Sequence, residues 1–120
     1  MGSPVISQLG LKPDQLSGET VIITGAGGGI GFEAARALLW LGANVIIAEI
    51  NEVSGNHAEQ LLATEFEPGR VLFVQTDVGD ETSVQSLYEA SRKRFGKVDV
   101  VINNATIATL GMVKDCDRVP

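Results

Sequence analysis

A cluster of glycines is the first feature of this sequence that points to chemistry. Five glycines fall within seven positions in "TGAGGGIG", between an apolar run ending at Thr24 and a helical pattern beginning at Ile30. Glycine loses the most backbone entropy on folding, so such a cluster needs a physical reason. Free backbone N–H groups at a helix N-terminus bind a diphosphate, and residues without side chains let it approach. The alternative is a flexible surface turn.

Three of these glycines have separate expected roles. Gly25 permits a tight turn out of the strand, Gly29 lets the backbone approach the diphosphate, and Gly31 lets the helix pack closely on the sheet. A glycine-rich string alone is weak evidence. At a strand-to-helix junction of a βαβ unit it indicates a dinucleotide-binding site.

An acidic residue at the end of the next apolar run fits the same ligand. Glu49 lies 18 residues beyond Gly31 in "NVIIAEI". A carboxylate there accepts both ribose hydroxyls of an adenosine and repels a 2′-phosphate. No Arg or Lys lies in "GAGGGIG" or "AEINEV" to bind that phosphate. NAD is therefore favoured over NADP, the alternative being a solvated glutamate at a strand end.

The elements that must position these residues alternate between strands and helices. Short β-branched runs predict buried strands, and apolar residues at helical spacing predict helices between them. In the first helix, this spacing selects Ile30, Ala34, Ala37, Leu38 and Leu41 as the apolar face. The expected strands are residues 19–24, 44–50, 71–78 and 97–105, and the expected helices are residues 30–41, 53–65 and 80–95, the last capped by Asp80 or Thr82.

This alternation predicts an α/β fold. Strands apolar on both faces imply a parallel sheet covered on both sides, hence three layers. Right-handed crossovers give the strand order 3-2-1-4, the first half of a doubly wound, Rossmann-type sheet. Residues 1–18 are expected to form an N-terminal arm, and residues 19–120 the dinucleotide-binding domain.

Four motifs in order resemble the short-chain dehydrogenase/reductase family. "TGAGGGIG" resembles that family's Thr-Gly-x-x-x-Gly-x-Gly motif, and it is followed by Glu49, by "DV" at Asp77–Val78 and by "NNA" at Asn103–Ala105. The resemblance covers residues 16 to 110. It implies that Asp77 bonds the adenine amino group with Val78 against the ring, and that Thr24 braces the turn.

The resemblance also implies that the "NNA" backbone lies beside the cofactor riboses. Thr106 stands where the family usually has glycine, which adds bulk near the nicotinamide side. The cofactor-binding residues expected for this chain are Thr24, Gly25, Gly27, Gly28, Gly29, Ile30, Gly31, Glu49, Ile50, Asp77, Val78, Asn103, Asn104 and Ala105.

No catalytic residue is expected within the 120 residues. Members of the family carry a catalytic Ser and a Tyr-x-x-x-Lys pair after the fourth strand, the Tyr acting as general acid/base. Here the only tyrosine is Tyr88, upstream of "NNA", with Arg92 in the place of the lysine. The chain is therefore interpreted as the cofactor-binding half of an NAD-dependent oxidoreductase acting on an alcohol or carbonyl compound. The alternatives are a non-catalytic dinucleotide-binding module or sensor, and a truncation product.

Composition excludes several other function classes. A net charge of −6 and a pI of about 4.6 disfavour nucleic-acid and membrane-surface binding. The single Cys116 excludes an internal disulfide, and we expect a cytoplasmic protein without a signal peptide. No His/Cys/carboxylate spacing indicates a metal site, and His57 is expected to be solvated. An open edge on the fourth strand predicts a homo-oligomer.

Overall fold

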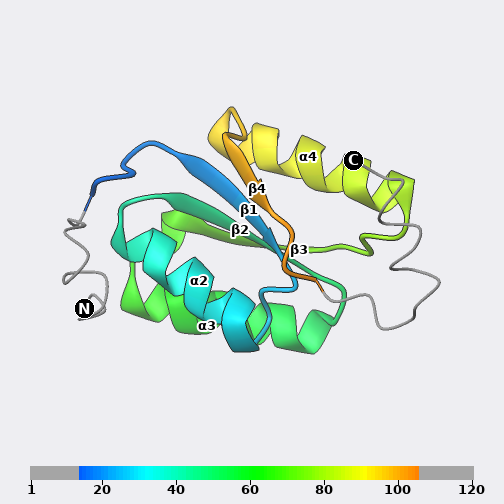
Figure 1. The fold of residues 1–120 in the computed structure, drawn as a ribbon, viewed down its shortest axis with the longest axis horizontal. Coiled ribbons are helices and arrows are strands. Elements are labelled where there is room, and N and C mark those ends of the chain that lie inside the picture. The colour runs from blue at the N-terminus through cyan, green and yellow to red at the C-terminus, as the bar shows by residue number, and fades with distance from the viewer. Residues whose placement is uncertain (1–13, 106–120) are drawn as a thin grey trace.

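Four parallel strands form the centre of the computed structural model, which describes residues 14–105. They are β1 (Thr20–Thr24), β2 (Asn44–Glu49), β3 (Val71–Gln75) and β4 (Val100–Ile102), in the order β3-β2-β1-β4 (Figure 1). Every pair of neighbouring strands is parallel. The predicted strand order is confirmed.

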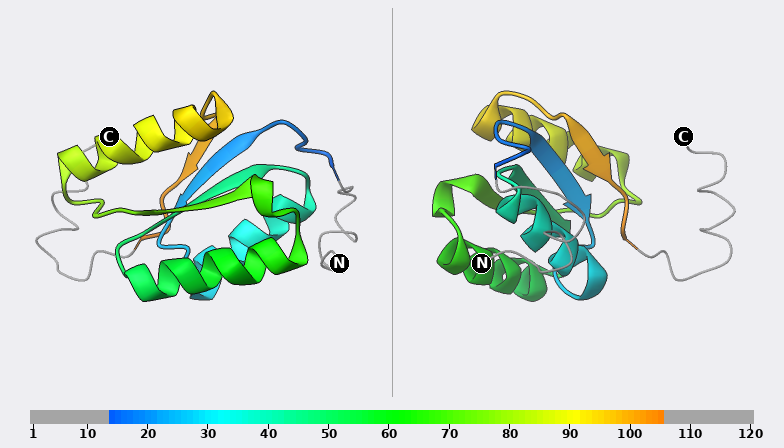
Figure 2. Two further views of the ribbon diagram at one scale, coloured as in Figure 1. Left: turned by 180° about the vertical axis from the view of Figure 1, so that it is seen from behind. Right: turned by 60° about the vertical axis from the view of Figure 1, so that its left-hand side comes forward.

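Helices cover both faces of this sheet. Helices α2 (Gly29–Trp40) and α3 (Glu52–Glu65) lie on one face and α4 (Glu81–Phe95) on the other (Figure 2), with a short 3₁₀ helix η1 (Pro68–Arg70) before β3. The Asp80 carboxylate caps α4 by accepting the Thr82 N–H at 3.0 Å, as predicted. The three-layer α/β architecture is confirmed.

The core is divided by the sheet into two unequal parts. Strand β1 is buried along its whole length and β2 from Val45 to Ala48, because each has neighbours on both sides. The cluster under α4 is the smaller one, with Ile22, Ile46, Ala48 and Leu87 buried. The buried residues under α2 and α3 are Val21, Ile23, Ala26, Ala35, Leu39, Ala43, Val45, Ile47, Ala58, Leu62 and Val71.

The predicted apolar face of the first helix is correct in part, since Ala34 and Leu38 pack against the core and Leu41 is buried, but it is wrong at Ile30. Ile30 is 82% exposed, and the buried residues of α2 are Gly31, Ala35 and Leu39. A Cβ on Gly31 would come within 2.6 Å of the Gly25 carbonyl oxygen, so the helix approaches the strand-1 turn at Gly31. This close approach sets the rotation of α2 and turns Ile30 outward.

Strands β3 and β4 are several residues shorter than predicted, whereas β1 and β2 differ from the predicted ranges by one residue each. Strand β4 ends at Ile102 because Asn104 and Ala105 donate their N–H groups to the Thr24 hydroxyl instead of a strand neighbour. Strand β3 ends at Gln75, and the Asp77 N–H donates to the Ser83 hydroxyl of α4. In both cases the backbone N–H groups after the strand donate to a side-chain hydroxyl and not to a neighbouring strand.

The end of the expected N-terminal arm contacts the domain. Residues 14–18 form a turn in which the Leu16 N–H donates to the Leu41 carbonyl at 2.7 Å. The domain boundary at residue 18 stays a prediction, and Thr106 and Cys116 lie outside the described residues. Within residues 14–105, no helix is long and apolar enough to cross a membrane.

Candidate functional site

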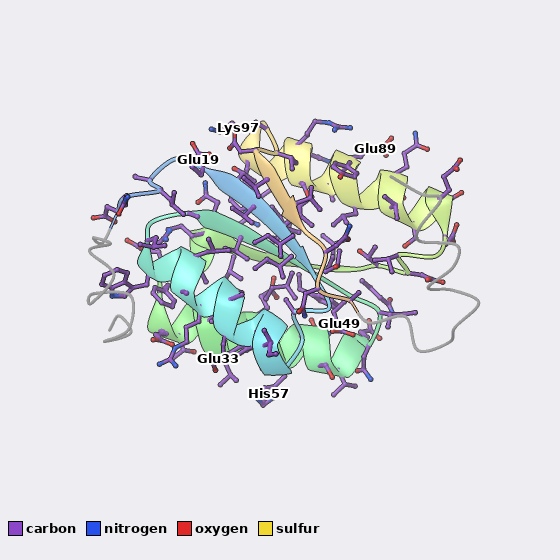
Figure 3. The ribbon with its side chains drawn as sticks, viewed as in Figure 1. Glu19, Glu33, Glu49, His57, Glu89 and Lys97 are labelled. Atoms are coloured by element: carbon purple, nitrogen blue, oxygen red, sulfur yellow. The ribbon has the colours of Figure 1, made fainter. Side chains whose placement is uncertain are left out.

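The predicted site residues lie together at the carboxyl end of the strands. Since all four strands are parallel, the segments following them lie at one edge of the sheet. Glu49 lies at this end near the start of α3, whereas Glu19 and Lys97 lie at the opposite end (Figure 3). The sheet therefore brings the glycine loop, Glu49, Asp77–Val78 and Asn103–Ala105 to one edge.

Gly25 and Gly31 are required by the packing of the protein itself. Gly25 has φ +67°, and a Cβ there would lie 2.9 Å from the Ala105 Cα. A Cβ on Gly31 would overlap the Asn104 side-chain amide as well as the Gly25 carbonyl. These contacts fit the predicted roles of Gly25 in the turn and Gly31 in close helix packing.

Two other glycines face open space. A Cβ on Gly28 or Gly29 would meet nothing within 4 Å, although the positive φ of Gly29, +61°, also favours glycine. Gly28 is the N-cap of α2, and no side chain caps this N-terminus or places a carboxylate in the first turn of the helix. By contrast, α3 and α4 are each capped by a side chain and have a glutamate in the first turn. The α2 N-terminus is thus suited to an external anion.

Glu49 lies directly beside this loop. Its Oε1 accepts the Gly27 N–H at 3.0 Å, and its Oε2 accepts the Asn51 N–H at 3.1 Å. A Cβ on Gly27 would lie 2.7 Å from Glu49 Oε1 and 2.9 Å from the Ser54 Cβ. Gly27 is therefore a glycine because the loop rests on Glu49 and on the start of α3.

Thr24 joins the glycine loop to the segment after β4. Its buried hydroxyl accepts the N–H groups of Asn104 at 2.9 Å and Ala105 at 3.0 Å. The Asn104 side-chain amide donates to the Gly25 carbonyl at 3.2 Å, while the neighbouring Asn103 is exposed. This geometry fits the expected bracing role of Thr24.

The segment after β3 adds polar and apolar groups. Asp77 Oδ1 accepts the Gly79 N–H at 2.9 Å, and the Asp77 N–H donates to Ser83 Oγ, also at 2.9 Å. Val78 is exposed, and Ile50, the residue after β2, is 59% exposed. One polar group and two apolar side chains are thus available for a ring-shaped ligand. The roles of all these residues toward a cofactor stay predictions.

Two residues of this region were missed by the sequence reasoning. Ser83 holds the Asp77 backbone, and only its position in the first turn of a capped helix could have indicated it. Gly55 packs α3 against β3, since a Cβ there would overlap the Phe73 ring. Gly55 stands alone in the predicted second helix, and a glycine inside a helical pattern is a signal for close packing.

The remaining residues considered from the sequence, Tyr88 and His57, lie on helices α4 and α3. Tyr88 packs half-buried against the core under α4, with the Arg92 guanidinium 5.8 Å from its ring centroid. Its interpretation as non-catalytic stays a prediction. His57 is exposed on α3. Among residues 14–105, no group of three or more His, Cys, Asp or Glu side chains could hold a metal ion.

The sequence of this site matches a known family. The family model described as short chain dehydrogenase matches residues 19–119. The chain belongs to the short-chain dehydrogenase family. This confirms the resemblance found from "TGAGGGIG", Glu49, "DV" and "NNA".

Relatives of this short-chain dehydrogenase chain include a short chain dehydrogenase/reductase, astE, of Aspergillus oryzae. It is 41% identical over 92 residues, which cover 77% of this chain and 35% of that protein. The NAD(+) 15-hydroxyprostaglandin dehydrogenase of Bos taurus is 36% identical over 92 residues, covering the same shares of the two chains. The chain thus spans about a third of the length of these two curated relatives.

A solved structure shows the same fold. The C-domain of a bacterial malonyl-CoA reductase, crystallised with NADP, superposes with a TM-score of 0.75 at 30% identity. The superposition covers 79% of this chain and 16% of that one.

Proposed function

We propose that this chain is the cofactor-binding part of an oxidoreductase that transfers hydride between a nicotinamide dinucleotide and an alcohol or carbonyl compound. The main observation behind this proposal is the uncapped N-terminus of α2, where Gly28 and Gly29 face open space beside the Glu49 carboxylate. Backbone N–H groups there would hold the diphosphate, and Ile50 and Val78 would enclose the adenine. Membership of the short-chain dehydrogenase family supports this assignment.

NAD is the proposed cofactor. Glu49 places a carboxylate beside the loop, where it would accept ribose hydroxyls and repel a 2′-phosphate. The bovine relative is named for NAD(+), whereas the malonyl-CoA reductase domain was crystallised with NADP. Family membership alone therefore leaves both cofactors open, and the proposal depends on Glu49.

Calorimetric titration of the chain with NADH and NADPH tests this proposal. We expect NADH to bind more tightly, because placing like charges together at a binding contact costs up to several kcal/mol. Glu49→Ala should narrow the difference between the two cofactors. Equal affinities for NADH and NADPH in the unmodified chain would contradict the choice of NAD. Absence of binding by either would contradict the dinucleotide site itself.

We further propose that the chain self-associates through β4. Val100 is 44% exposed and Val101 is 40% exposed, and β4 pairs only with β1 among the described strands. An exposed strand edge with apolar side chains favours pairing with another chain. Sedimentation should show association that increases with concentration, and Val101→Lys should reduce it. A monomer at high concentration would contradict this part of the proposal.

A further inference from the structure

The glycine loop is held by a side chain as well as by its own turns. The two oxygens of the Glu49 carboxylate accept the N–H groups of Gly27 and Asn51, at 3.0 and 3.1 Å. Asn51 is the N-cap residue of α3, and Gly27 lies between β1 and α2. One carboxylate therefore links the end of β2 to the glycine loop and to the start of α3.

The contact between Glu49 and the loop leaves no space for a side chain. A Cβ on Gly27 would lie 2.7 Å from the Glu49 carboxylate and 2.9 Å from the Ser54 Cβ. Both distances are shorter than normal van der Waals contacts. The path of the loop at Gly27 is therefore fitted to Glu49, while Gly28 and Gly29 immediately after it remain open.

We propose that Glu49 is a positioning residue for the diphosphate-binding loop, independently of its contact with the ribose. The proposal rests on the proposed function of the loop. Each carboxylate oxygen has two lone pairs, so ribose hydroxyls can bind without displacing Gly27 or Asn51. A loop already held in its bound shape loses less conformational entropy when the diphosphate binds.

The positioning role and charge repulsion predict opposite changes in diphosphate affinity when the Glu49 carboxylate is removed. Removing a carboxylate close to the site would strengthen the binding of an anionic diphosphate if only charge mattered. If Glu49 supports the loop, removing it would instead weaken the binding of the diphosphate. A ligand that has the diphosphate but lacks the ribose hydroxyls therefore distinguishes the two roles.

The experiment compares ADP with 2′,3′-dideoxy-ADP by calorimetric titration of the unmodified chain and of Glu49→Ala. We expect the variant to bind both nucleotides less tightly, and the dideoxy nucleotide by about three- to tenfold, the usual effect of losing one net hydrogen bond. Unchanged or tighter binding of the dideoxy nucleotide would overturn the positioning role and leave Glu49 as a ribose ligand only.

Glu59 provides a matched control. Its Oε2 accepts the Phe73 N–H at 2.8 Å, so it is also a carboxylate holding a neighbouring backbone group, but on the edge strand β3. Glu59→Ala removes the same charge and should leave the affinity for the dideoxy nucleotide unchanged. If it weakened binding as much as Glu49→Ala, the effect would be general and the proposal would fail.

A measurement without ligand separates this proposal from the proposed function. In Glu49→Ala, amide exchange followed by NMR should be faster at Gly27 and Asn51. It should be unchanged at Gly25, whose N–H donates to the Ala48 carbonyl at 2.7 Å. Unchanged exchange at Gly27 would overturn the proposal even if nucleotides bind. Faster exchange at Gly25 as well would mean that the substitution loosens the fold. The exchange rates at Gly27, Asn51 and Gly25 would then be measured in Glu49→Gln, which keeps one acceptor oxygen, and judged in the same way.

Discussion

The two ends of the β-sheet are formed by the same four strands, but they differ in how their polar groups are bonded. At the amino end, the Asp99 carboxylate accepts the Thr20 N–H at 2.8 Å and pairs with Lys97 at 3.0 Å. At the same end, the Arg70 guanidinium donates to the Ala43 carbonyl at 2.9 Å and to a carbonyl at the end of α2. Charged side chains there bond to backbone groups of neighbouring elements.

At the carboxyl end, backbone groups and apolar side chains face outward. The α2 N-terminus has no side-chain cap, Gly28 and Gly29 border open space, and Ile30 and Ile50 are exposed. Three carboxylates also accept backbone N–H groups here, and none of them caps the α2 N-terminus. Glu49 bonds to the glycine loop, Asp77 to Gly79, and Asp80 to the start of α4. The amino end therefore contributes to stability, while the carboxyl end leaves donors and apolar surface for a ligand. Function lies in a site added to a stable fold.

The largest expected effect is on binding, from Gly29→Val. The branched side chain would occupy the open space that the diphosphate needs, so we expect loss of measurable NADH binding in a calorimetric titration. Because Gly29 has φ +61°, the variant should also lose about 1–2 kcal/mol of unfolding free energy. The fold should remain, as shown by circular dichroism.

Gly18 is the matched control for this substitution. It has φ +89° and open space around its Cβ position, but it precedes β1 at the amino end. Gly18→Val should therefore lose a similar amount of stability and retain NADH binding. If both variants lost binding, the loss would come from strain, and if neither did, the glycine loop would not be the diphosphate site.

The backbone path of the carboxyl end could be predicted from the sequence because its signals are local. The turn at Gly25, the open position of Gly29 and the end of β2 at Glu49 each depend on a few neighbouring residues. The strand order then follows from right-handed crossovers between parallel strands. The Asp80 cap belongs to the same class of local signal.

Contacts between elements distant in sequence could not be predicted. The rotation of α2 depends on Gly31 meeting Gly25 and Asn104, so its apolar pattern alone placed Ile30 on the wrong face. The length of β4 depends on the Thr24 hydroxyl, which is about 80 residues away in the chain. The amino end is made of such contacts, which explains why no sequence motif indicated it.

An intermediate effect, on stability alone, is expected from Arg70→Met. The substitution keeps the apolar stem but removes the donors to the Ala43 and Leu39 carbonyls. The Leu39 carbonyl also accepts the Gly42 N–H at 3.0 Å, so the substitution takes one of its two bonds, while the Ala43 carbonyl loses the Arg70 donor. Weakening the bonding of these partly buried acceptors should lower the unfolding free energy by about 1–3 kcal/mol in urea titrations. NADH affinity should stay within about twofold, because the substitution removes no hydrogen bond at the binding site. Losing even one hydrogen bond there would change the affinity by about twofold or more.

Arg94→Met is the comparison for Arg70. Arg94 donates to the Gly69 carbonyl at 3.1 Å in an exposed position, so water can replace it and the stability should hardly change. If Arg70→Met were as mild as Arg94→Met, the amino end would not be a source of stability. If Arg70→Met weakened NADH binding as strongly as Gly29→Val, the two ends would not be separable.

The smallest expected effect is the pH dependence contributed by Asp99. The hydrogen bond from the Thr20 N–H, and then that from Lys97, hold the pKa of Asp99 below its ordinary value. A carboxylate with a lowered pKa in the folded state stabilises the protein above the pKa of the unfolded chain, about 3.9 for Asp. This stabilisation is lost as the pH falls through the lower folded-state pKa. Asp99→Asn should therefore reduce stability most above about pH 5 and progressively less below it.

Urea titrations of the unmodified chain and Asp99→Asn across this pH range measure the difference directly, because other carboxyl groups contribute equally to both proteins. Lys97 is half-exposed and screened by water, and the Thr20 bond is the larger cause of the pKa shift. Lys97→Met should consequently leave most of the pH dependence in place. A stability difference between the unmodified chain and Asp99→Asn that did not change with pH would mean that the charge of Asp99 is not what stabilises the amino end. In that case the contrast between the two ends would depend on Arg70 and its carbonyl partners alone, and NADH affinity at neutral pH should still be the same in all three proteins.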